Sequence, residues 1–454
     1  MLNPKIFKSY DIRGIYQTEI TGEVAYIVGK ALAKMFDAKL IVVGRDARLG
    51  SPELHKELLR GLTSQGVEVH DLGLVPIEVM YFAAGKYGYD GGVMVTASHN
   101  PKEYAGLKVV RKGVHMVRGK EILEYINQNP GTPDPSSPNS GGGGETKGNV
   151  VQKDVRKEYV EHALSFIDKN ALKPFKVVVD AGNGMAGQIF PILSKQLPLN
   201  IIEMNFEPDG NFPAHPSNPL EPESQKGLTE RVVREKADMG VIFDGDADRI
   251  FFVDEKGRFL GSDPTICLLA RMMLEKIPGA GIAYSVECGR VVSEKIKEWG
   301  GRPIRTPVGY VNVSEGMRRD GGVMGGEYSA HYCFKENFYA DSGLIAFLLI
   351  LELASKTDKP FSEVVAEFEV YARAQINLTI HNIPEALQAI KEKYNDGAMD
   401  ELDGITVWYP DWWFVVRGSN TEPVLRVNIE ADTTQILEEK KKEMLSFIES
   451  VAKS

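Results

Sequence analysis

The sequence has few cysteines, no long hydrophobic run and no excess of positive charge, and each absence argues against a class of protein. Its three cysteines, Cys267, Cys288 and Cys333, are odd in number and widely spaced, so they form neither a disulfide framework nor a zinc pattern. The longest apolar run, residues 344–351, is far shorter than the roughly 18 residues of a membrane span. The net charge of −10 argues against general nucleic-acid binding. Because no hydrophobic segment typical of a signal peptide opens the chain, we expect a cytoplasmic protein that binds neither nucleic acid nor membrane.

What is present is the composition of an ordinary globular protein with several domains. The 454 residues, 43% hydrophobic and 26% charged, are enough for three or four domains of roughly 100–150 residues each. Strand and helix patterns alternate over most of the chain, which predicts α/β architecture. Three segments open alike, with an apolar strand, a loop that contains Gly or Asp, and a helix. Their strand starts at Leu40, Val177 and Gly281 indicate an internal repeat of one α/β module.

The last part of the chain has a different pattern. Its order of strands and helices predicts a small α+β domain with an antiparallel sheet. The expected strands cover residues 374–380, 405–409, 413–416 and 425–429, and the expected helices cover residues 384–394 and 433–451. Between the first two α/β segments, the proline- and glycine-rich residues 130–148 predict a loop or linker. Near the start of the chain, Ser51 followed by Pro52 predicts a helix with Ser51 as its N-cap.

A candidate nucleophile lies at the end of an expected strand. Residues 93–95 are apolar, and Thr96, Ser98 and His99 follow at once. Ligands bind at the carboxyl edge of the sheet in α/β proteins, so Ser98 is placed to act on one. A serine-hydrolase role fits less well, because no Gly-x-Ser-x-Gly turn surrounds Ser98 and because neighbouring side chains, here Ser98 and His99, point apart in an extended chain. A loop hydroxyl that bonds only its own backbone is the third interpretation.

A candidate metal site lies in the loop between two later strands. Asp244, Asp246 and Asp248 alternate in a tight loop, and such oxygen ligands suit Mg²⁺ or Ca²⁺. The spacing also opens an EF-hand, but the sixth position is Arg249 instead of glycine and the flanks read as strands. An acidic turn without a metal is the remaining alternative. Arg249 is suited to contact a phosphate oxygen.

Two further polar loops carry candidate ligand-binding residues. Residues 417–423 combine Arg417 with hydroxyl and amide side chains and a glycine, which suits a phosphate site, although a polar hairpin turn has the same composition. In residues 325–331, Glu327 and Ser329 alternate and are expected to bind sugar hydroxyls. His331 continues the same parity and is a candidate general base. Lys108 and Arg13 are isolated basic residues, and the sequence pattern makes them no more than candidate site residues.

Together these loops resemble the α-D-phosphohexomutase superfamily, and most closely its phosphomannomutase/phosphoglucomutase branch. The resemblance covers essentially the whole chain and depends on four motifs in the order of the family. They are residues 96–101 (TASHNP), 244–249 (DGDADR), 326–331 (GEYSAH) and 417–423 (RGSNTEP). Residues 10–14 (YDIRG) and 106–108 (GLK) also match family segments.

The resemblance implies a fold of three related α/β domains with mixed sheets and a fourth α+β domain with a four-stranded antiparallel sheet, around a central cleft. The expected domains are residues 1–150, which carry a phosphoserine, 151–255, which bind the metal, 256–371, which recognise the sugar, and 372–454, which bind a phosphate. The implied activity is Mg²⁺-dependent interconversion of hexose 1-phosphate and hexose 6-phosphate, of mannose, glucose or both. It would proceed through a phosphoserine and a hexose 1,6-bisphosphate.

The resemblance also implies a role for each matching residue. Ser98 would carry the phosphoryl group and bind Mg²⁺ with Asp244, Asp246 and Asp248. Arg13, Lys108 and Arg249 would stabilise the transferring group, and His331 would be the general base. The residues expected to bind substrate are Glu327, Ser329, Arg417, Ser419, Asn420, Thr421 and Tyr10. We expect a monomer or a weak homo-oligomer with a phosphosugar substrate.

Two departures from the family pattern leave alternatives open. Glu287 stands where a lysine is expected before a cysteine, and Tyr310 stands where some relatives have histidine. Glu287 would repel a phosphate, and Arg290 or Arg305 is expected to compensate. A phosphoglucosamine mutase, a non-catalytic sugar-phosphate-binding relative and an EF-hand-like calcium protein are the alternative functions.

Overall fold

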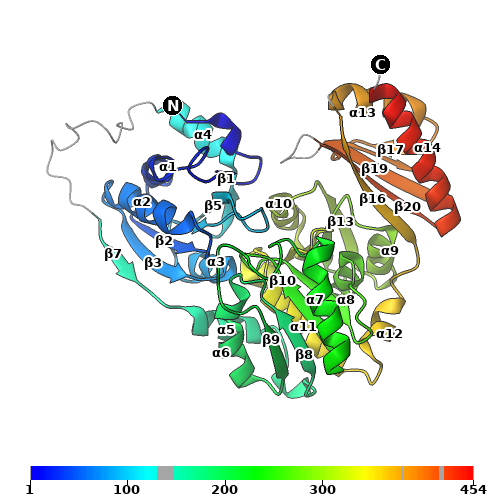
Figure 1. The fold of residues 1–454 in the computed structure, drawn as a ribbon, viewed down its shortest axis with the longest axis horizontal. Coiled ribbons are helices and arrows are strands. Elements are labelled where there is room, and N and C mark those ends of the chain that lie inside the picture. The colour runs from blue at the N-terminus through cyan, green and yellow to red at the C-terminus, as the bar shows by residue number, and fades with distance from the viewer. Residues whose placement is uncertain (1, 130–147, 381, 419–423, 453–454) are drawn as a thin grey trace. The chain divides into compact units, whose positions relative to one another are not determined.

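The computed structural model describes residues 2–129, 148–380, 382–418 and 424–452 (Figure 1). The chain divides into two compact units. The amino-terminal unit comprises Met1–Gly261 and Ala330–Ser362, and the carboxyl-terminal unit comprises Ser262–Ser329 and Glu363–Ser454. Of the predicted linker at residues 130–148, residues 130–147 lie outside the described part of the chain.

The first sheet of the amino-terminal unit is mixed, with strands in the order β1-β5-β4-β2-β3-β7 and β6 paired to β5. Strands β4, β2 and β3 are parallel, and β5 is antiparallel to β1 and β4. Residues along β2 alternate between the two faces of the sheet. Ile41 and Val43 belong to the core that includes α1 and α2, whereas Val42 lies on the opposite face near Gly92 and Met80 of α3. The bounds are β1 Ile12–Ile15, α1 Gly22–Met35, β2 Leu40–Arg45, α2 Ser51–Thr63, β3 Glu68–Leu74, α3 Ile77–Lys86, β4 Gly91–Val95, β5 Tyr104–Arg111, β6 His115–Val117, α4 Gly119–Gln128 and β7 Val150–Gln152.

The second sheet of this unit has the order β11-β10-β8-β9. Strand β8 is parallel to β9 and β10, and β10 is antiparallel to β11. Helix α11 belongs to the later segment of the unit and is buried along almost its whole length. The bounds are α5 Arg156–Leu164, β8 Lys176–Asp180, α6 Phe190–Leu193, β9 Asn200–Met204, α7 Pro222–Glu235, β10 Met239–Phe243, β11 Ile250–Asp254, β15 Tyr332–Phe334 and α11 Gly343–Ser355.

In the carboxyl-terminal unit, strands β13, β12 and β14 are parallel, with β12 in the centre. Each α/β sheet therefore has one central strand between two parallel neighbours: β2 between β3 and β4, β8 between β9 and β10, and β12 between β13 and β14. These central strands begin at Leu40, Lys176 and Gly281, so the predicted internal repeat is confirmed. The bounds are α8 Ser262–Lys276, β12 Gly281–Ser285, α9 Arg290–Glu298, β13 Arg302–Thr306, α10 Tyr310–Asp320, β14 Gly322–Gly326 and α12 Phe361–Ala366.

The last sheet is antiparallel, in the order β16-β20-β19-β18-β17. Four of its strands are those expected from the sequence, and the structure adds the three-residue edge strand β17. One face packs against α13 and α14 in an apolar core. The bounds are β16 Ala372–Thr379, α13 Ile383–Lys393, β17 Ala398–Asp400, β18 Ile405–Trp408, β19 Trp412–Gly418, β20 Val424–Ala431 and α14 Thr434–Ala452. Short 3-10 helices lie at Pro4–Ile6, Lys169–Ala171, Ala186–Gln188, Ser194–Gln196 and Lys335–Asn337.

One local feature differs from the sequence pattern. The predicted N-cap at Ser51 is wrong by one residue: Gly50 is the N-cap of α2, and the Ser51 hydroxyl donates to Asp46.

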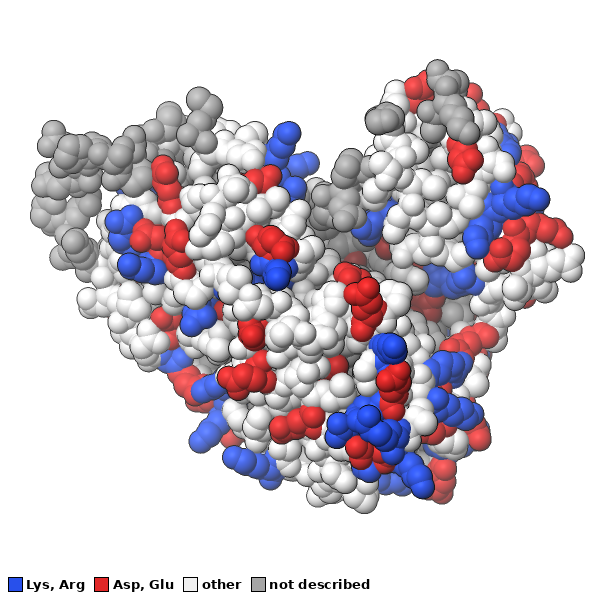
Figure 2. Space-filling view, viewed as in Figure 1, with Lys and Arg blue, Asp and Glu red and all other residues white. Residues whose placement is uncertain are grey.

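Among the described helices, none combines the length and apolarity needed to cross a bilayer. On the face drawn in Figure 2, lysine and arginine side chains are interspersed with aspartate and glutamate, so the surface charge there is mixed.

A buried polar junction fixes the start of α11 in the amino-terminal unit. The Glu78 carboxylate on α3 accepts from the hydroxyl of Tyr159 on α5, at 2.5 Å, and from the backbone N–H of Leu344, at 3.1 Å. The Tyr159 hydroxyl also lies 2.8 Å from Oγ of Ser342, the N-cap of α11. Glu78 is fully buried, and burial raises its pKa to about 8. The junction therefore joins three segments that are distant in sequence.

Replacing Glu78 with glutamine is expected to flatten the pH dependence of stability. Because its pKa is raised from 4.5 to about 8 by folding, Glu78 favours the fold fully below the unfolded pKa, and this contribution is lost as pH rises through about 8. Glutamine keeps the shape and hydrogen bonds without a titratable group. Urea unfolding from pH 5 to 9 tests this, with Glu23→Gln on the exposed side of α1 as control. Equal pH slopes for wild type and Glu78→Gln would contradict the assignment.

Candidate active site

Ser98 lies directly after β4 in a buried loop with an unusual backbone conformation. Its φ of 50° is left-handed, and its N–H donates to Oγ1 of Thr96 at 2.9 Å. This turn directs the Ser98 hydroxyl to the Asp244 carboxylate, with Oγ 2.8 Å from Oδ2. Ser98 is 1% exposed. The structure therefore brings Ser98 beside the acidic loop of the second sheet, the pairing that the resemblance implies.

The acidic loop connects β10 to β11. Asp244, Asp246 and Asp248 are at most 1% exposed, and each offers a carboxylate oxygen within 4.8 Å of the others. A Cβ on Gly245 would lie 2.6 Å from the Ser98 carbonyl oxygen, so only glycine lets the loop approach Ser98 this closely. Because strands flank the loop on both sides, the EF-hand interpretation is wrong.

Lys108 is the main cation within this acidic group. Its Nζ donates to Oδ2 of Asp246 at 2.9 Å and to Oδ2 of Asp248 at 2.5 Å, and the side chain is 2% exposed. Burial raises the pKa of Asp248, but Lys108 and His331 lower it more, so the pKa lies well below its usual range. Burial, together with the charges of Asp248 and Asp246, raises the pKa of Asp244 to about 8. One lysine thus does not neutralise three buried carboxylates.

The residues present fit a divalent cation. Within the described part of the chain, Oδ1 of Asp246 is buried and has no hydrogen-bond partner, and Oδ1 of Asp248 is buried with only an ion-pair contact to His331, at 3.4 Å. Clustered carboxylate oxygens are the ligands that hard cations such as Mg²⁺ prefer. A bound cation would use these oxygens and supply the missing positive charge.

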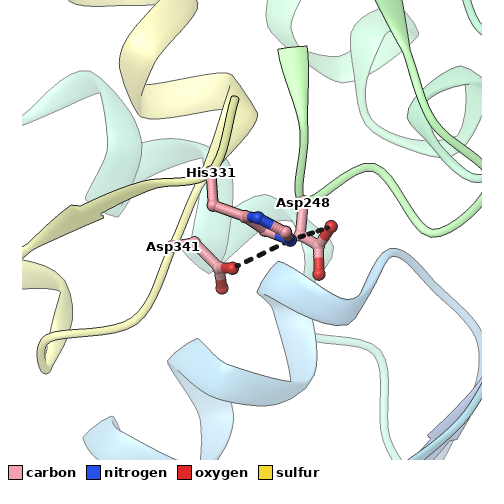
Figure 3. Close-up of side chains that lie close together, drawn as sticks. All are labelled: Asp248, His331 and Asp341. Carbon is pink, nitrogen blue, oxygen red and sulfur yellow. Dashed lines mark ion pairs between the residues drawn. The ribbon is translucent and has the colours of Figure 1, made fainter. Parts of the chain in front are cut away.

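His331 lies between two carboxylates at the other side of the acidic loop (Figure 3). Its Nε2 is 3.4 Å from Oδ1 of Asp248 and 3.9 Å from Oδ2 of Asp341, and Nε of Arg249 donates to it at 3.2 Å. Burial, followed by the charge of Asp248, raises the pKa of Asp341 to about 7. An imidazole nitrogen beside two carboxylates is well placed to take up a proton.

The remaining candidates of this unit surround the Ser98 loop. Arg13 on β1 donates to the Asn100 side chain and to Asp11. Tyr10 is half-buried in the bend before β1. The expectation that Ser98 and His99 point apart is wrong, because the left-handed Ser98 brings its Oγ 3.3 Å from Nδ1 of His99. Loss of solvation and the charge of Arg249 lower the pKa of His99 well below its ordinary value.

Two buried residues of this unit were not found from the sequence. Asp341 precedes α11 and carries no local pattern beyond an Asp-Ser-Gly start to an apolar helix. Arg48 is fully buried and donates to the carbonyl oxygens of Ser98 at 2.6 Å and Pro101 at 2.8 Å, and to those of Asn100 and Tyr104. Arg48 therefore fixes the backbone of the loop that carries Ser98.

Replacing Arg48 with glutamine is expected to lower both stability and turnover. The shorter side chain leaves buried carbonyl groups without donors, at a cost of about 2–4 kcal/mol in the free energy of unfolding. The loosened Ser98 loop is expected to reduce turnover about 100-fold. Urea unfolding and steady-state kinetics measure the two effects. Arg60→Gln, at a side chain 59% exposed on α2, is the matched control, and an Arg48→Gln protein equal to it in both measurements would refute the assignment.

In the carboxyl-terminal unit, Glu327 and Ser329 contact each other as their alternation suggested. Glu327 is buried, its Oε1 accepts from the N–H of Gly309 at 2.6 Å, and its Oε2 lies 3.4 Å from the Ser329 hydroxyl. The predicted parity does not continue to His331, because Ala330 has a left-handed backbone with φ of 65°. The pair therefore offers carboxylate and hydroxyl oxygens independently of the histidine.

Arg417, on β19, is bound to Glu287 at the end of β12. Its Nε and Nη2 donate to Oε1 of Glu287 at 2.9 and 2.6 Å. The expectation that Arg290 or Arg305 would compensate Glu287 is wrong, because these arginines pair with other carboxylates: Arg290 with Glu430 and Asp432, and Arg305 with Asp400. Ser419, Asn420 and Thr421 lie outside the described residues, and Tyr310 is buried at the start of α10.

Comparison with known proteins assigns most of the chain to one family. The descriptions "Phosphoglucomutase/phosphomannomutase, alpha/beta/alpha domain I", "domain II" and "domain III" match residues 4–130, 157–257 and 261–371. The C-terminal domain of the same family matches residues 360–446.

Individual relatives agree over nearly their full lengths. The chain is 36% identical to a phosphomannomutase of Escherichia coli over 97% of this chain and 98% of that protein. It is 37% identical to a phosphomannomutase/phosphoglucomutase of Pseudomonas aeruginosa over 96% and 94%. A crystal structure of a phosphoglucomutase/phosphomannomutase family protein from Burkholderia thailandensis covers 99% of this chain and 98% of its own, with a TM-score of 0.89 and 32% identity. The order of motifs, the repeated α/β sheets and these matches show that the chain belongs to the phosphoglucomutase/phosphomannomutase family.

Proposed function

We propose that this phosphohexomutase interconverts the 1-phosphate and 6-phosphate of mannose, glucose or both, with Ser98 as its phosphoryl carrier. The observation that carries the proposal is the placement of the Ser98 hydroxyl, 2.8 Å from Asp244, within a buried group of carboxylates and Lys108. Lys108 favours transfer of a phosphoryl group, since the transition state spreads negative charge that positioned cations stabilise, and the carboxylates would hold a metal ion that adds positive charge there.

The reaction consists of two transfers. In the first, the bond between phosphorus and the Ser98 oxygen breaks and a new bond forms to O6 of a hexose 1-phosphate. The hydroxyl proton of O6 passes to His331, and the Ser98 oxygen takes up a proton from water. In the second, after the sugar has turned round, the Ser98 hydroxyl loses its proton to water and attacks the 1-phosphate of the bisphosphate, the bond between phosphorus and O1 breaks, and His331 returns its proton to O1. Lys108, Arg249 and Arg13 stabilise the phosphoryl group during both transfers.

Asp244, Asp246 and Asp248, with an oxygen of phospho-Ser98, would hold Mg²⁺. The ion supplies positive charge at the transferring group. In its absence Asp244 retains a proton near neutral pH, because burial and its neighbours raise its pKa to about 8. Without a bound cation, the negative charge of the aspartates therefore disfavours binding of a phosphate beside them.

We also propose that recognition of the substrate belongs to the carboxyl-terminal unit. Glu327 and Ser329 would bind sugar hydroxyls, and Arg417 with Ser419, Asn420 and Thr421 would bind the phosphate that is not reacting. Tyr10 would contact substrate from the amino-terminal unit. The corresponding domains would be residues 1–150, 151–255, 256–371 and 372–454, and the protein would act as a monomer or weak homo-oligomer.

A coupled assay of several hexose 1-phosphates tests the proposal. With Mg²⁺ and a hexose 1,6-bisphosphate as primer, turnover of mannose or glucose 1-phosphate is expected to exceed that of glucosamine 1-phosphate. Preferential turnover of glucosamine 1-phosphate would replace the proposed substrate with that of the rival mutase. Binding of all three sugars without turnover would favour a non-catalytic relative.

A further inference from the structure

We propose that Glu287 is an internal counterion of Arg417, which the phosphate of the substrate has to displace. The inference rests on the proposed role of Arg417 in phosphate binding. It concerns the residue at which this chain departs from the lysine expected of the family, and it makes Glu287 a determinant of phosphate affinity.

The geometry of the pair carries the inference. Both donors on one edge of the Arg417 guanidinium, Nε and Nη2, bind the same oxygen of Glu287 at 2.9 and 2.6 Å. This is one of the two edges that an arginine presents to a phosphate in a two-point contact, and the other edge shares Nη2 with it. The two side chains are 3% and 5% exposed, so little water screens them. A phosphate and Glu287 therefore compete for the same nitrogen atoms.

Neighbouring residues hold the backbone of Glu287, whereas its side chain has few contacts besides those with Arg417. Nη2 of Arg373 donates to the Glu287 carbonyl oxygen at 2.5 Å. The side chain has one further described partner, the Asn428 amide, at 3.4 Å. Displacement of the carboxylate thus costs few contacts besides those with Arg417.

The charge near Arg417 also favours replacement of Glu287 by a phosphate. Arg426 is the register partner of Arg417 across β19 and β20, so the two arginines lie on the same face of the sheet. On the same face, Trp413 and Val415 pack with Val286 in a small apolar cluster. Arg426 therefore adds positive charge to this face, and removal of the Glu287 charge makes the net charge beside Arg417 more positive by one.

Glu287→Gln is the test, because glutamine keeps the size and a hydrogen-bond acceptor but removes the charge. Without ligand, the variant is expected to unfold at a lower temperature than wild type, since Arg417 loses its buried counterion. Binding of glucose 1-phosphate is expected to tighten about ten-fold, which corresponds to about 1.4 kcal/mol. Inorganic phosphate is expected to raise the unfolding temperature more in the variant than in wild type. Glu363→Gln, on the exposed side of α12, is the matched control and should match wild type.

The readouts separate this role from a purely structural one. A lower unfolding temperature with unchanged or weaker ligand binding would overturn the inference and leave Glu287 as a structural partner. The tightening should also disappear in the Arg417→Gln background, and its persistence there would equally overturn it. Turnover of hexose phosphates by wild type tests the proposed function separately, so failure of one does not imply failure of the other.

Discussion

Replacing Ser98 with alanine is expected to lower turnover of hexose 1-phosphate at least about a thousand-fold, because the phosphoryl carrier is lost. The substitution removes one buried hydroxyl. Asp244 still accepts from the backbone N–H of Arg249 at 3.2 Å, and His99 is partly exposed to solvent. We therefore expect the fold to persist. Steady-state kinetics at saturating bisphosphate measure the loss, and circular dichroism and thermal unfolding establish that the variant is folded.

Ser51→Ala provides a matched control for Ser98→Ala. Ser51 is also a buried serine that donates to an aspartate of the same unit, Asp46. Its removal is expected to affect stability more than turnover. A folded Ser98→Ala protein with wild-type turnover would show that Ser98 carries no phosphoryl group.

Removal of Mg²⁺ with a chelator is expected to abolish turnover, and Asp248→Asn is expected to reduce it at least about a thousand-fold at ordinary Mg²⁺ concentrations. The three buried carboxylates are arranged for a cation that Lys108 alone does not replace. Asparagine keeps the size of Asp248 but removes one charge and leaves Lys108 with one fewer carboxylate. Turnover as a function of Mg²⁺ concentration measures both effects, with Asp358→Asn, at a fully exposed position, as control.

The pH dependence of Mg²⁺ binding follows from the same group. Without metal, burial and the neighbouring carboxylates raise the pKa of Asp244 to about 8, so a cation must displace a proton at lower pH. Affinity is therefore expected to rise with pH, by up to about ten-fold per unit, and to level off above about 8. Calorimetric titration between pH 6 and 9 measures this. An affinity independent of pH, or full turnover in chelator, would contradict the metal site.

The sequence was sufficient to find the candidate residues that lie in a recognisable local pattern of residue types. Ser98 follows a buried strand, and three alternating aspartates follow another, so both were expected at the carboxyl edges of their sheets. The contact between Ser98 and Asp244 spans 146 residues, and the resemblance to the phosphohexomutases supplied that pairing. The repeat of the α/β sheets was likewise visible in the spacing of their first strands.

Residues that act through long-range contacts were missed or misassigned. Arg48 reaches the Ser98 loop across 50 residues, and nothing near it in sequence distinguishes it from a surface arginine. Glu287 was expected to pair with a nearby arginine, but the antiparallel sheet brings Arg417 to it from 130 residues away. The contact of Ser98 with His99 depends on one left-handed residue, which a strand-like pattern does not predict. Each error concerns tertiary placement or backbone conformation, which residue type and spacing do not determine.

The central claim, that Ser98 carries the phosphoryl group, is tested most directly by the mass of the intact protein. After incubation with hexose 1,6-bisphosphate and Mg²⁺, wild type is expected to gain about 80 Da, the mass of one phosphoryl group, located on Ser98 by fragmentation. Addition of excess hexose 1-phosphate should then alter the labelled fraction on the timescale of turnover, and Ser98→Ala should remain unmodified throughout. A wild-type enzyme that turns over hexose phosphates without modification at Ser98, or with a modification that survives in Ser98→Ala, would contradict the account.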